Sequence, residues 1–263
     1  MRRITVLLLA AFIVFSLCSC GDKTELDNTE STTEYAPVIN TDNVVTVADE
    51  DLPLWETRDM EDGTVYIYKY NGKNATLTIP ETIDGKNVTG IFGEAFSNTD
   101  IVKNISLPNT LKTISSKAFF ECKSLETVNM PDTLTFIGDY AFCNCTHLKE
   151  IILPRDLEHI GVTAFDGCSS LSKVVFNGEK LKSISQYAFC GTAITELHIP
   201  YGVTKLDFYV NDSKSIDVYI PDTCTDFDSP FASGEGVVIH GISGSEAEIY
   251  ATQNGNTFVS DYK

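Results

Sequence analysis

Two short motifs contain residue types that could do chemistry. Cys143, Cys145 and His147 alternate with single residues, and thiolate sulfur and imidazole nitrogen are ligands that zinc prefers. A structural zinc site needs four ligands, however, and no second cluster occurs in the sequence at ligand spacing. Ser170 and Lys173 match the S-x-x-K pattern of a serine nucleophile, but the motifs that accompany it in such enzymes are missing from the sequence. We therefore expect neither a metal site nor a catalytic serine.

The histidines do not form a catalytic arrangement either. They occupy unrelated positions in the sequence, at His147, His159, His198 and His240. The sequence also lacks the nucleophile elbow, the H-E-x-x-H zinc motif, the phosphate loop and the dinucleotide fingerprint. We therefore predict a protein that is not an enzyme and needs no cofactor.

Charge narrows the range of partners. The 263 residues carry a formal net charge of −18, whereas binding to phosphate backbones needs clustered lysine and arginine. Nucleic acid is therefore not expected as a partner. Hydrophobic residues make up 43% of the chain, which is enough to form a core.

The elements that must position any site are set by an internal repeat. An Ala-Phe pair recurs at spacings of 23, 23, 23 and 24 residues, at Ala95, Ala118, Ala141, Ala164 and Ala188. A proline ends the apolar, period-two stretch of most units, at Pro80, Pro108, Pro131, Pro154, Pro200 and Pro221, and Asn177 takes this place once. Each unit predicts a short strand, a turn, a second extended piece and one helical turn. No such unit buries its own apolar face, so we expect the units to stack into one continuous core.

This pattern resembles the BspA-type leucine-rich repeat family of bacterial surface proteins, over about residues 60–260. The resemblance implies a repeat solenoid, mainly β with short helical turns, of about seven coils and capped at both ends. We expect an N-terminal cap at 54–93, repeats at 94–236 and a C-terminal cap at 237–263. Within the first cap, Asn71-Gly72 predicts a hairpin over residues 64–80. In the second, Ser245 and Gly255 predict the ends of a short helix.

The N-terminus has the features of an export signal. Two arginines precede an apolar run that is too short for an ordinary membrane-spanning helix. The following Leu-Cys-Ser-Cys resembles the bacterial lipobox, which implies a lipoprotein signal peptide at 1–19 and lipid attachment at Cys20; the alternative is a plain secretory signal. Residues 20–53 are polar and acidic, and they predict a flexible tether.

Three cysteines share one repeat position, three residues after the phenylalanine: Cys122, Cys145 and Cys168. Stacked units lie about 4.8 Å apart, so neighbouring members could reach disulfide range. Alternatively, they are buried free thiols that act as small apolar residues. We favour the free thiols.

The specificity of a repeat surface lies in the outward positions of the first strands. Two residues before the proline, the outward side chain changes along the chain from polar to apolar or aromatic, from Asn129 to Ile152, Val175, His198 and Tyr219. Four residues before it, the side chains include Glu150, Lys173 and Glu196. These eight residues are the candidate binding face; ordinary cross-strand packing is the alternative interpretation.

The resemblance implies a non-catalytic cell-surface lipoprotein, exported and held on the outside of the bacterial cell membrane by its lipid anchor. Its role would be adhesion, or binding of an unknown protein or glycan. A structural or scaffold lipoprotein of the cell envelope without an external ligand is the alternative.

Overall fold

The computed structural model describes residues 54–207, 209, 215–227 and 236–262. The chain separates into two compact units, residues 1–37 and 38–263, and every described residue belongs to the second. The predicted signal peptide, Cys20 and the predicted tether lie outside the described residues.

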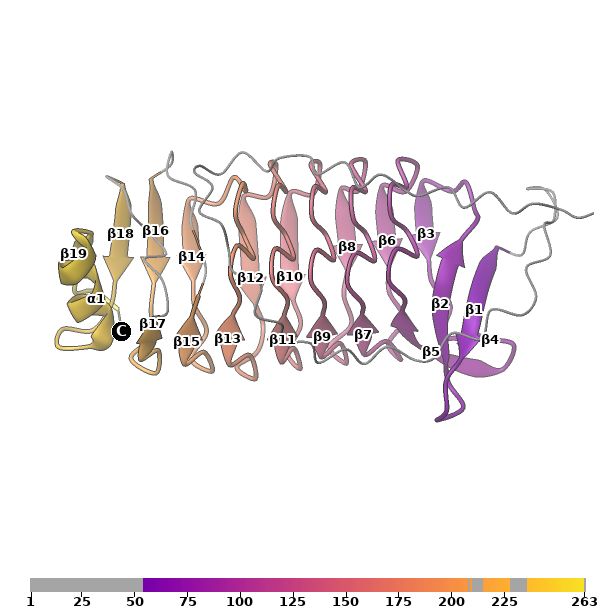
Figure 1. Ribbon diagram of the computed structural model, residues 1–263, viewed down its shortest axis with the longest axis horizontal. Coiled ribbons are helices and arrows are strands. Elements are labelled where there is room, and N and C mark those ends of the chain that lie inside the picture. Colours follow the sequence, from indigo (N-terminus) through magenta and orange to yellow (C-terminus); the bar gives the residue numbers. More distant parts are fainter. Residues whose placement is uncertain (1–53, 208, 210–214, 228–235, 263) are drawn as a thin grey trace, which may run out of the picture. The chain divides into compact units, whose positions relative to one another are not determined.

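The described chain winds into a β-solenoid, as predicted from the repeat, and it has about eight coils where about seven were expected (Figure 1). Each coil contributes a first strand, which ends one or two residues before the position of the repeat proline. These strands are β3 (Thr76–Thr78), β6 (Asn104–Ser106), β8 (Thr127–Asn129), β10 (Glu150–Leu153), β12 (Lys173–Phe176), β14 (Glu196–His198), β16 (Ile216–Tyr219) and β18 (Val237–His240), followed by β19 (Thr257–Val259).

A second row of strands, which have two residues each after β5, runs along the other side of the solenoid (Figure 1). It consists of β5 (Lys86–Ile91), β7 (Thr113–Ile114), β9 (Phe136–Ile137), β11 (His159–Ile160), β13 (Ser183–Ile184), β15 (Lys205–Leu206) and β17 (Asp226–Phe227). Within both rows the strands pair in parallel, and equivalent repeat positions stand opposite each other, as Ile105 does to Val128. The register therefore places equivalent side chains in columns.

The first-strand row is hydrogen-bonded in three groups. These are β3-β6-β8, β10-β12 and β14-β16-β18-β19. At both breaks, side chains that face the core are only half-buried. These residues are Val128 and Met130 before the first break, and Val174 and Phe176 before the second. All four still pack against the core, but they are less covered than their equivalents in other coils, such as Ile105 and Ile151.

Stacked aromatic rings form the spine of the core. Each repeat phenylalanine lies on the next, with ring centroids 4.9 Å apart from Phe96 to Phe119 and from Phe119 to Phe142, and 5.2 Å apart from Phe142 to Phe165. Trp55 and Tyr70 continue the stack at its N-terminal end. The Ala-Phe repeat therefore encodes an unbroken column of rings inside the core.

Each Ala-Phe pair begins a tight turn between the two rows of strands. The predicted helical turn appears as consecutive backbone hydrogen bonds of three-residue reach, such as Ala118 N to Ser115 O and Phe120 N to Lys117 O. The residue before the alanine is left-handed in successive coils, with φ of 60° at Lys117, 56° at Tyr140 and 54° at Thr163. The same backbone is thus imposed on lysine, tyrosine and threonine alike, which shows that stacking of the coils overrides local preference.

The predicted hairpin over residues 64–80 is wrong. β2 (Val65–Tyr70) pairs antiparallel with β1 (Trp55–Asp59), whereas β3 pairs with β6 in the other row. The reason lies in Tyr70, whose ring is buried on Phe96 and whose hydroxyl accepts the Asn74 backbone N–H at 3.1 Å. The segment after Tyr70 therefore carries the chain across to the first-strand row. A small hairpin does occur later, between β4 (Thr82–Ile83) and β5.

The C-terminal end carries the helix α1 (Glu246–Asn254). Its ends are those predicted: Ser245 is the N-cap residue, and Gly255 is left-handed, with a φ of 72°. The Ser245 hydroxyl makes no capping hydrogen bond; instead the Glu248 carboxylate accepts the Gly244 backbone N–H at 2.6 Å. Among the described residues, no helix has the length and apolar character needed to cross a membrane.

Candidate functional site

The residues of the two short motifs do not come together in one site. Cys143 and Cys145 are buried, whereas His147 lies at the surface with Nδ1 2.6 Å from the backbone oxygen of Lys123. Lys173 forms an ion pair with Glu150, on the outward face of the preceding coil. Within residues 54–262, as far as they are described, no three histidine, cysteine or acidic side chains gather in a way that could hold a metal ion.

The cysteine column consists of buried free thiols, as favoured above. Each sulfur donates to the backbone oxygen of a phenylalanine in the preceding coil: Cys122 to Phe96 at 2.9 Å and Cys145 to Phe119 at 3.2 Å. Cys168 repeats the contact with Phe142. Burial raises the pKa of Cys122 to about 12, and it also raises the pKa of Cys145. These thiols therefore satisfy carbonyl groups at the turn and are poor nucleophiles.

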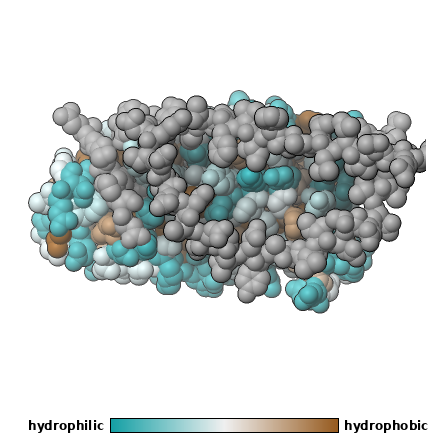
Figure 2. All heavy atoms as spheres, in the orientation of Figure 1, coloured by the Kyte–Doolittle hydropathy of each residue, from teal (hydrophilic) through white to brown (hydrophobic). Residues whose placement is uncertain are grey.

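The outward side chains of the first strands form two columns. The central column runs through Thr78, Ser106, Asn129, Ile152, Val175, His198, Tyr219 and His240. The polar column beside it runs through Thr76, Asn104, Thr127, Glu150, Lys173, Glu196 and Asp217. Where Figure 2 shows described residues, hydrophilic side chains predominate and hydrophobic ones are scattered. The apolar part of the central column lies beside the charged residues Glu150, Lys173 and Glu196 of the polar column.

The central column changes character between β8 and β10. Asn129 on β8 is polar and exposed, whereas Ile152 on β10 is 47% exposed although it is apolar. From β14 onward the column becomes an aromatic stack: the ring centroids of His198 and Tyr219, and those of Tyr219 and His240, lie 4.1 Å apart. The rings are nearly parallel, at 3° and 15°. This stack holds the three outward side chains in fixed positions.

Carboxylates flank the stack. His198 Nε2 lies 2.6 Å from Oε1 of Glu196, and His240 lies between Asp261 at 2.8 Å and Asp217 at 3.3 Å. Burial lowers the pKa of His240, but the hydrogen bonds to the two aspartates outweigh it, so that the pKa is raised overall. Desolvation raises the pKa of Tyr219, and the nearby charge of Glu196 adds to this. The stack therefore presents a neutral phenol between two imidazoles in an acidic surrounding.

A pocket of about 380 Å³ opens beside this stack, at the break between β12 and β14. The coil that starts at Ala164 is one residue longer than its predecessors, and the extra residue lies between Asn177 and Leu181. Adjacent loops nevertheless touch, since a Cβ on Gly202 would lie 1.7 Å from the backbone oxygen of Glu179. The insertion and the break in the sheet together account for the opening in an otherwise regular wall.

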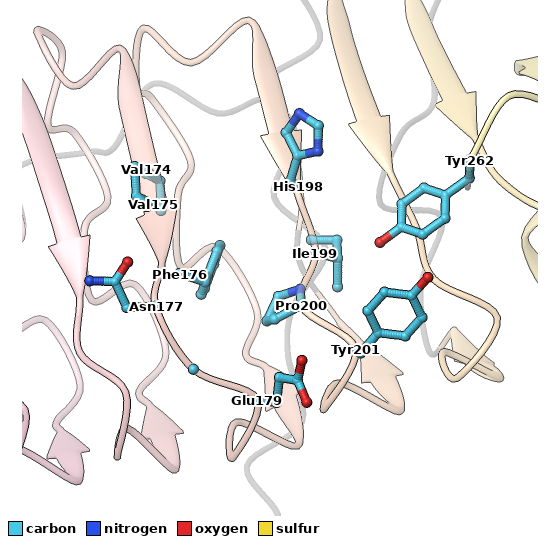
Figure 3. Close-up of a pocket in the computed structure, with 11 residues that line it drawn as sticks. Val174, Val175, Phe176, Asn177, Glu179, His198, Ile199, Pro200, Tyr201 and Tyr262 are labelled. Atoms are coloured by element: carbon cyan, nitrogen blue, oxygen red, sulfur yellow. The ribbon is translucent and has the colours of Figure 1, made fainter.

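The lining of the pocket combines rings, aliphatic side chains and a few polar groups. Val175 and His198 of the central column belong to it (Figure 3). Tyr201 and Tyr262 lie together along one side, with ring centroids 5.9 Å apart, and Glu179 lies at the lower end in Figure 3. Tyr262 follows β19, so the last described residue of the chain returns to cover the end of β14. The pocket thus adjoins the central column at Val175 and His198.

The structure brings together part of the face predicted from the sequence. Val175 and His198 meet at the pocket, His198 stacks on Tyr219, and Lys173 pairs with Glu150. Ile152 pairs with Val175 across β10 and β12. Glu196 contacts His198, whereas Asn129 lies on β8, beyond the other break in the sheet.

Four residues at this site escaped the sequence interpretation: Phe176, Tyr201, His240 and Tyr262. His240 continues the central column beyond Tyr219. The sequence prediction missed it because the repeat proline that marks the end of most other first strands is absent from this coil. Phe176 has the pattern of a core residue, and its exposure depends on the break in the sheet. The contact between Tyr201 and Tyr262 depends on the return of the chain end to the β14 coil.

Comparison with known proteins agrees with this architecture. The chain is similar in fold to the leucine-rich repeat protein TpLRR of T. pallidum, with 20% identity and a TM-score of 0.52 over 78% of this chain and 95% of that one. It is also similar to the pneumococcal vaccine antigen PcpA, with 21% identity and a TM-score of 0.50 over 71% of this chain and 62% of that one. A curated protein of matching sequence was not found.

The family assignment follows from the repeat itself. The model of the BspA type leucine rich repeat region matches residues 89–226, in 6 copies. These residues include all five Ala-Phe units and the first strands from β6 to β16. The chain therefore belongs to the BspA-type leucine-rich repeat family.

Proposed function

We propose that this protein is an exported, lipid-anchored protein of the bacterial cell surface that binds an external partner through its first-strand row. The lipobox-like sequence at Cys20 supports the anchor, and the acidic stretch at residues 20–53 would hold the solenoid away from the membrane. A rigid, repeat-built wall is suited to recognition because its outward residues vary while its core does not.

The observation that carries the binding role is the continuity between column and pocket. Val175 and His198 belong to both, and the exposed Ile152 and the stacked Tyr219 extend the same surface on either side. Exposed apolar and aromatic side chains around a concavity, with a polar rim, are typical of interaction sites. We name the surface formed by Ile152, Val175, His198 and Tyr219, together with the pocket, the recognition face.

A role without catalysis is part of the proposal. The thiols of Cys122 and Cys224 both have their pKa raised to about 12 by burial, so they are protonated at neutral pH. The imidazoles of His198 and His240 are engaged with carboxylates and with the Tyr219 ring. These thiols and imidazoles are therefore not proposed as catalytic groups, and the role proposed for the recognition face is binding.

The proposal is tested by replacing Ile152, Val175 and Tyr219 together by serine. The intact protein and the variant are compared for binding to host cells, to extracellular matrix and to protein and glycan arrays. We expect the variant to fold, since none of these side chains lies in the phenylalanine stack, and to lose most of the binding.

A matched control changes the N-terminal end of the central column, outside the recognition face. Thr78→Ser, Ser106→Ala and Asn129→Ser change the central column on β3, β6 and β8, away from the pocket. Equal binding by the serine variant and the wild type would show that the recognition face is not the site. If the wild-type protein bound nothing in any assay, the scaffold function would replace the proposed one.

A further inference from the structure

The pocket is lined by aromatic rings from three parts of the chain. Phe176 comes from the end of β12, His198 and Tyr201 come from β14 and the residues after it, and Tyr262 comes from the chain end. In Figure 3, Tyr201 and Tyr262 stand to the right of the pocket, His198 stands above it and Phe176 lies to the left. A guest that enters this space is therefore met by ring faces and edges on several sides.

The charge of the pocket is negative. Glu179 is the one ionised side chain in the lining apart from the titratable His198, and its carboxylate makes no ion pair or hydrogen bond with any other described residue. Other carboxylates nearby are already engaged: Glu150 with Lys173, Glu196 with His198, and Asp156 with Lys180 at 2.8 Å. The carboxylate of Glu179 is thus available to a ligand.

The surroundings strengthen this field. Of the lysines near Glu179 in sequence, Lys173 and Lys180 are neutralised by Glu150 and Asp156 on the coil before, whereas Lys182 is exposed and forms no ion pair within the described residues. Glu196, Asp217 and Asp261 lie around the aromatic stack on the neighbouring strands. The whole chain carries a formal net charge of −18, so long-range attraction also favours a cation.

We propose that the pocket receives the side chain of an arginine from a basic segment of a protein partner. A planar guanidinium stacks on aromatic faces and offers parallel N–H donors to a carboxylate, whereas an ammonium is a more strongly hydrated point charge. Glu179 would accept the guanidinium, Tyr201 and Tyr262 would flank it, and the Asn177 amide oxygen would take a remaining donor. This inference rests on the proposed function, because it assigns the chemistry of the partner at the recognition face.

The size of the pocket agrees with such a guest. A volume of about 380 Å³ is small for a ligand site and leaves room for one long side chain with its first waters. Val175 and Ile199 line the same space and would contact the aliphatic stem. The central column outside the pocket then remains available for the residues that flank the arginine in the partner.

The test uses the purified full-length protein, labelled on its tyrosine rings, and follows the ring resonances by NMR. N-acetyl-arginine amide is the probe, and N-acetyl-citrulline amide, which has the same shape without the charge, is its control. We expect the arginine probe to shift the Tyr201 and Tyr262 resonances with saturation in the millimolar range, and the citrulline probe to bind at least about 5-fold more weakly.

Variants identify the groups responsible. Glu179→Gln and Tyr262→Ala should each weaken binding of the arginine probe about 5- to 10-fold. Glu61→Gln and Tyr140→Ala, which remove an exposed carboxylate and an exposed ring elsewhere, should leave it unchanged. Equal affinity for arginine and citrulline, or no effect of Glu179→Gln, would overturn the assignment.

The outcomes also separate this inference from the proposed function. If sugars shift the two tyrosines and the arginine probe does not, the pocket binds glycans and the arginine assignment is wrong. If the serine variant of the recognition face loses partner binding while the arginine probe fails to bind, the proposed function stands and this inference fails. If the arginine probe binds as expected and no partner is found, the pocket chemistry stands and the proposed function fails.

Discussion

Nδ1 of His240 lies 2.8 Å from Oδ1 of Asp261, and this contact ties the end of the chain to β18. Asp261 immediately precedes Tyr262, whose ring lies against Tyr201 at the pocket. Nε2 of the same histidine faces Asp217, and its ring stacks on Tyr219. One buried imidazole therefore joins the chain end, the aromatic stack and the pocket.

This contact predicts a pH dependence of stability. The folded-state pKa of His240 is raised above 6.5, so the protonated form stabilises the folded protein. The contribution is fully present below pH 6.5 and is lost as the pH rises through the raised folded-state pKa. Asp261→Asn should therefore lower Tm more at about pH 5.5 than at about pH 8.5.

The comparison must be made between variants, because another histidine acts in the opposite sense. Burial lowers the pKa of His159, so its contribution to stability is present above pH 6.5 and decreases below it. Asp84→Asn, at an exposed turn between β4 and β5, is the matched control and should show no such pH dependence. The same loss of Tm from Asp261→Asn at both pH values would contradict the role given to His240.

The ring stack predicts a steep contrast between two phenylalanines. Phe142 is buried between Phe119 and Phe165, so Phe142→Ala should lower the free energy of unfolding by about 3–5 kcal/mol. Phe136 is 38% exposed and stacks on His159 at the surface, so Phe136→Ala should cost less than about 1 kcal/mol. Urea unfolding followed by circular dichroism measures both. Similar losses for the two variants would show that the stack is not the main source of core stability.

The thiol column predicts cysteines that do not react in the folded state. Because Cys122 donates to the Phe96 carbonyl and its pKa is raised to about 12, a maleimide at neutral pH should not modify it until the protein unfolds. Cys145 and Cys168 should behave in the same way. Intact mass before and after reduction, and peptide mapping after labelling in buffer and in urea, provide the readout. A mass increase on reduction, or labelling of the column in the native protein, would refute the free, buried thiols.

Much of the fold could be predicted from the sequence because the repeat specifies it several times over. The Ala-Phe period predicts stacked units with one continuous core, in which the structure then shows the rings from Phe96 to Phe189 in contact, and the repeat prolines mark the ends of the first strands. Stacking then places equivalent residues opposite each other, so the outward columns follow from the period alone. The first hairpin could not be found in this way, because the pairing of β2 with β1 depends on the burial of Tyr70 on Phe96.

The candidate site was only partly predictable for a related reason. Ile152, Val175, His198 and Tyr219 occupy a repeat column, and the structure places them on one face. The pocket depends on what departs from the repeat: one extra residue after Asn177, a break between β12 and β14, and a chain end that returns to Tyr201. None of these three features has a periodic signal in the sequence, so the pocket that they form could be found only in the structure.

The most direct measurement of the central claim is hydrogen–deuterium exchange of the full-length protein with and without a partner recovered from the binding assays. Binding at the recognition face should slow exchange in β10, β12, β14 and β16 and in residues 177–179 and 200–201, which line the pocket. The second-strand row from β7 to β15 should be unchanged. Protection confined to that second row, with none around Val175 and His198, would contradict the account.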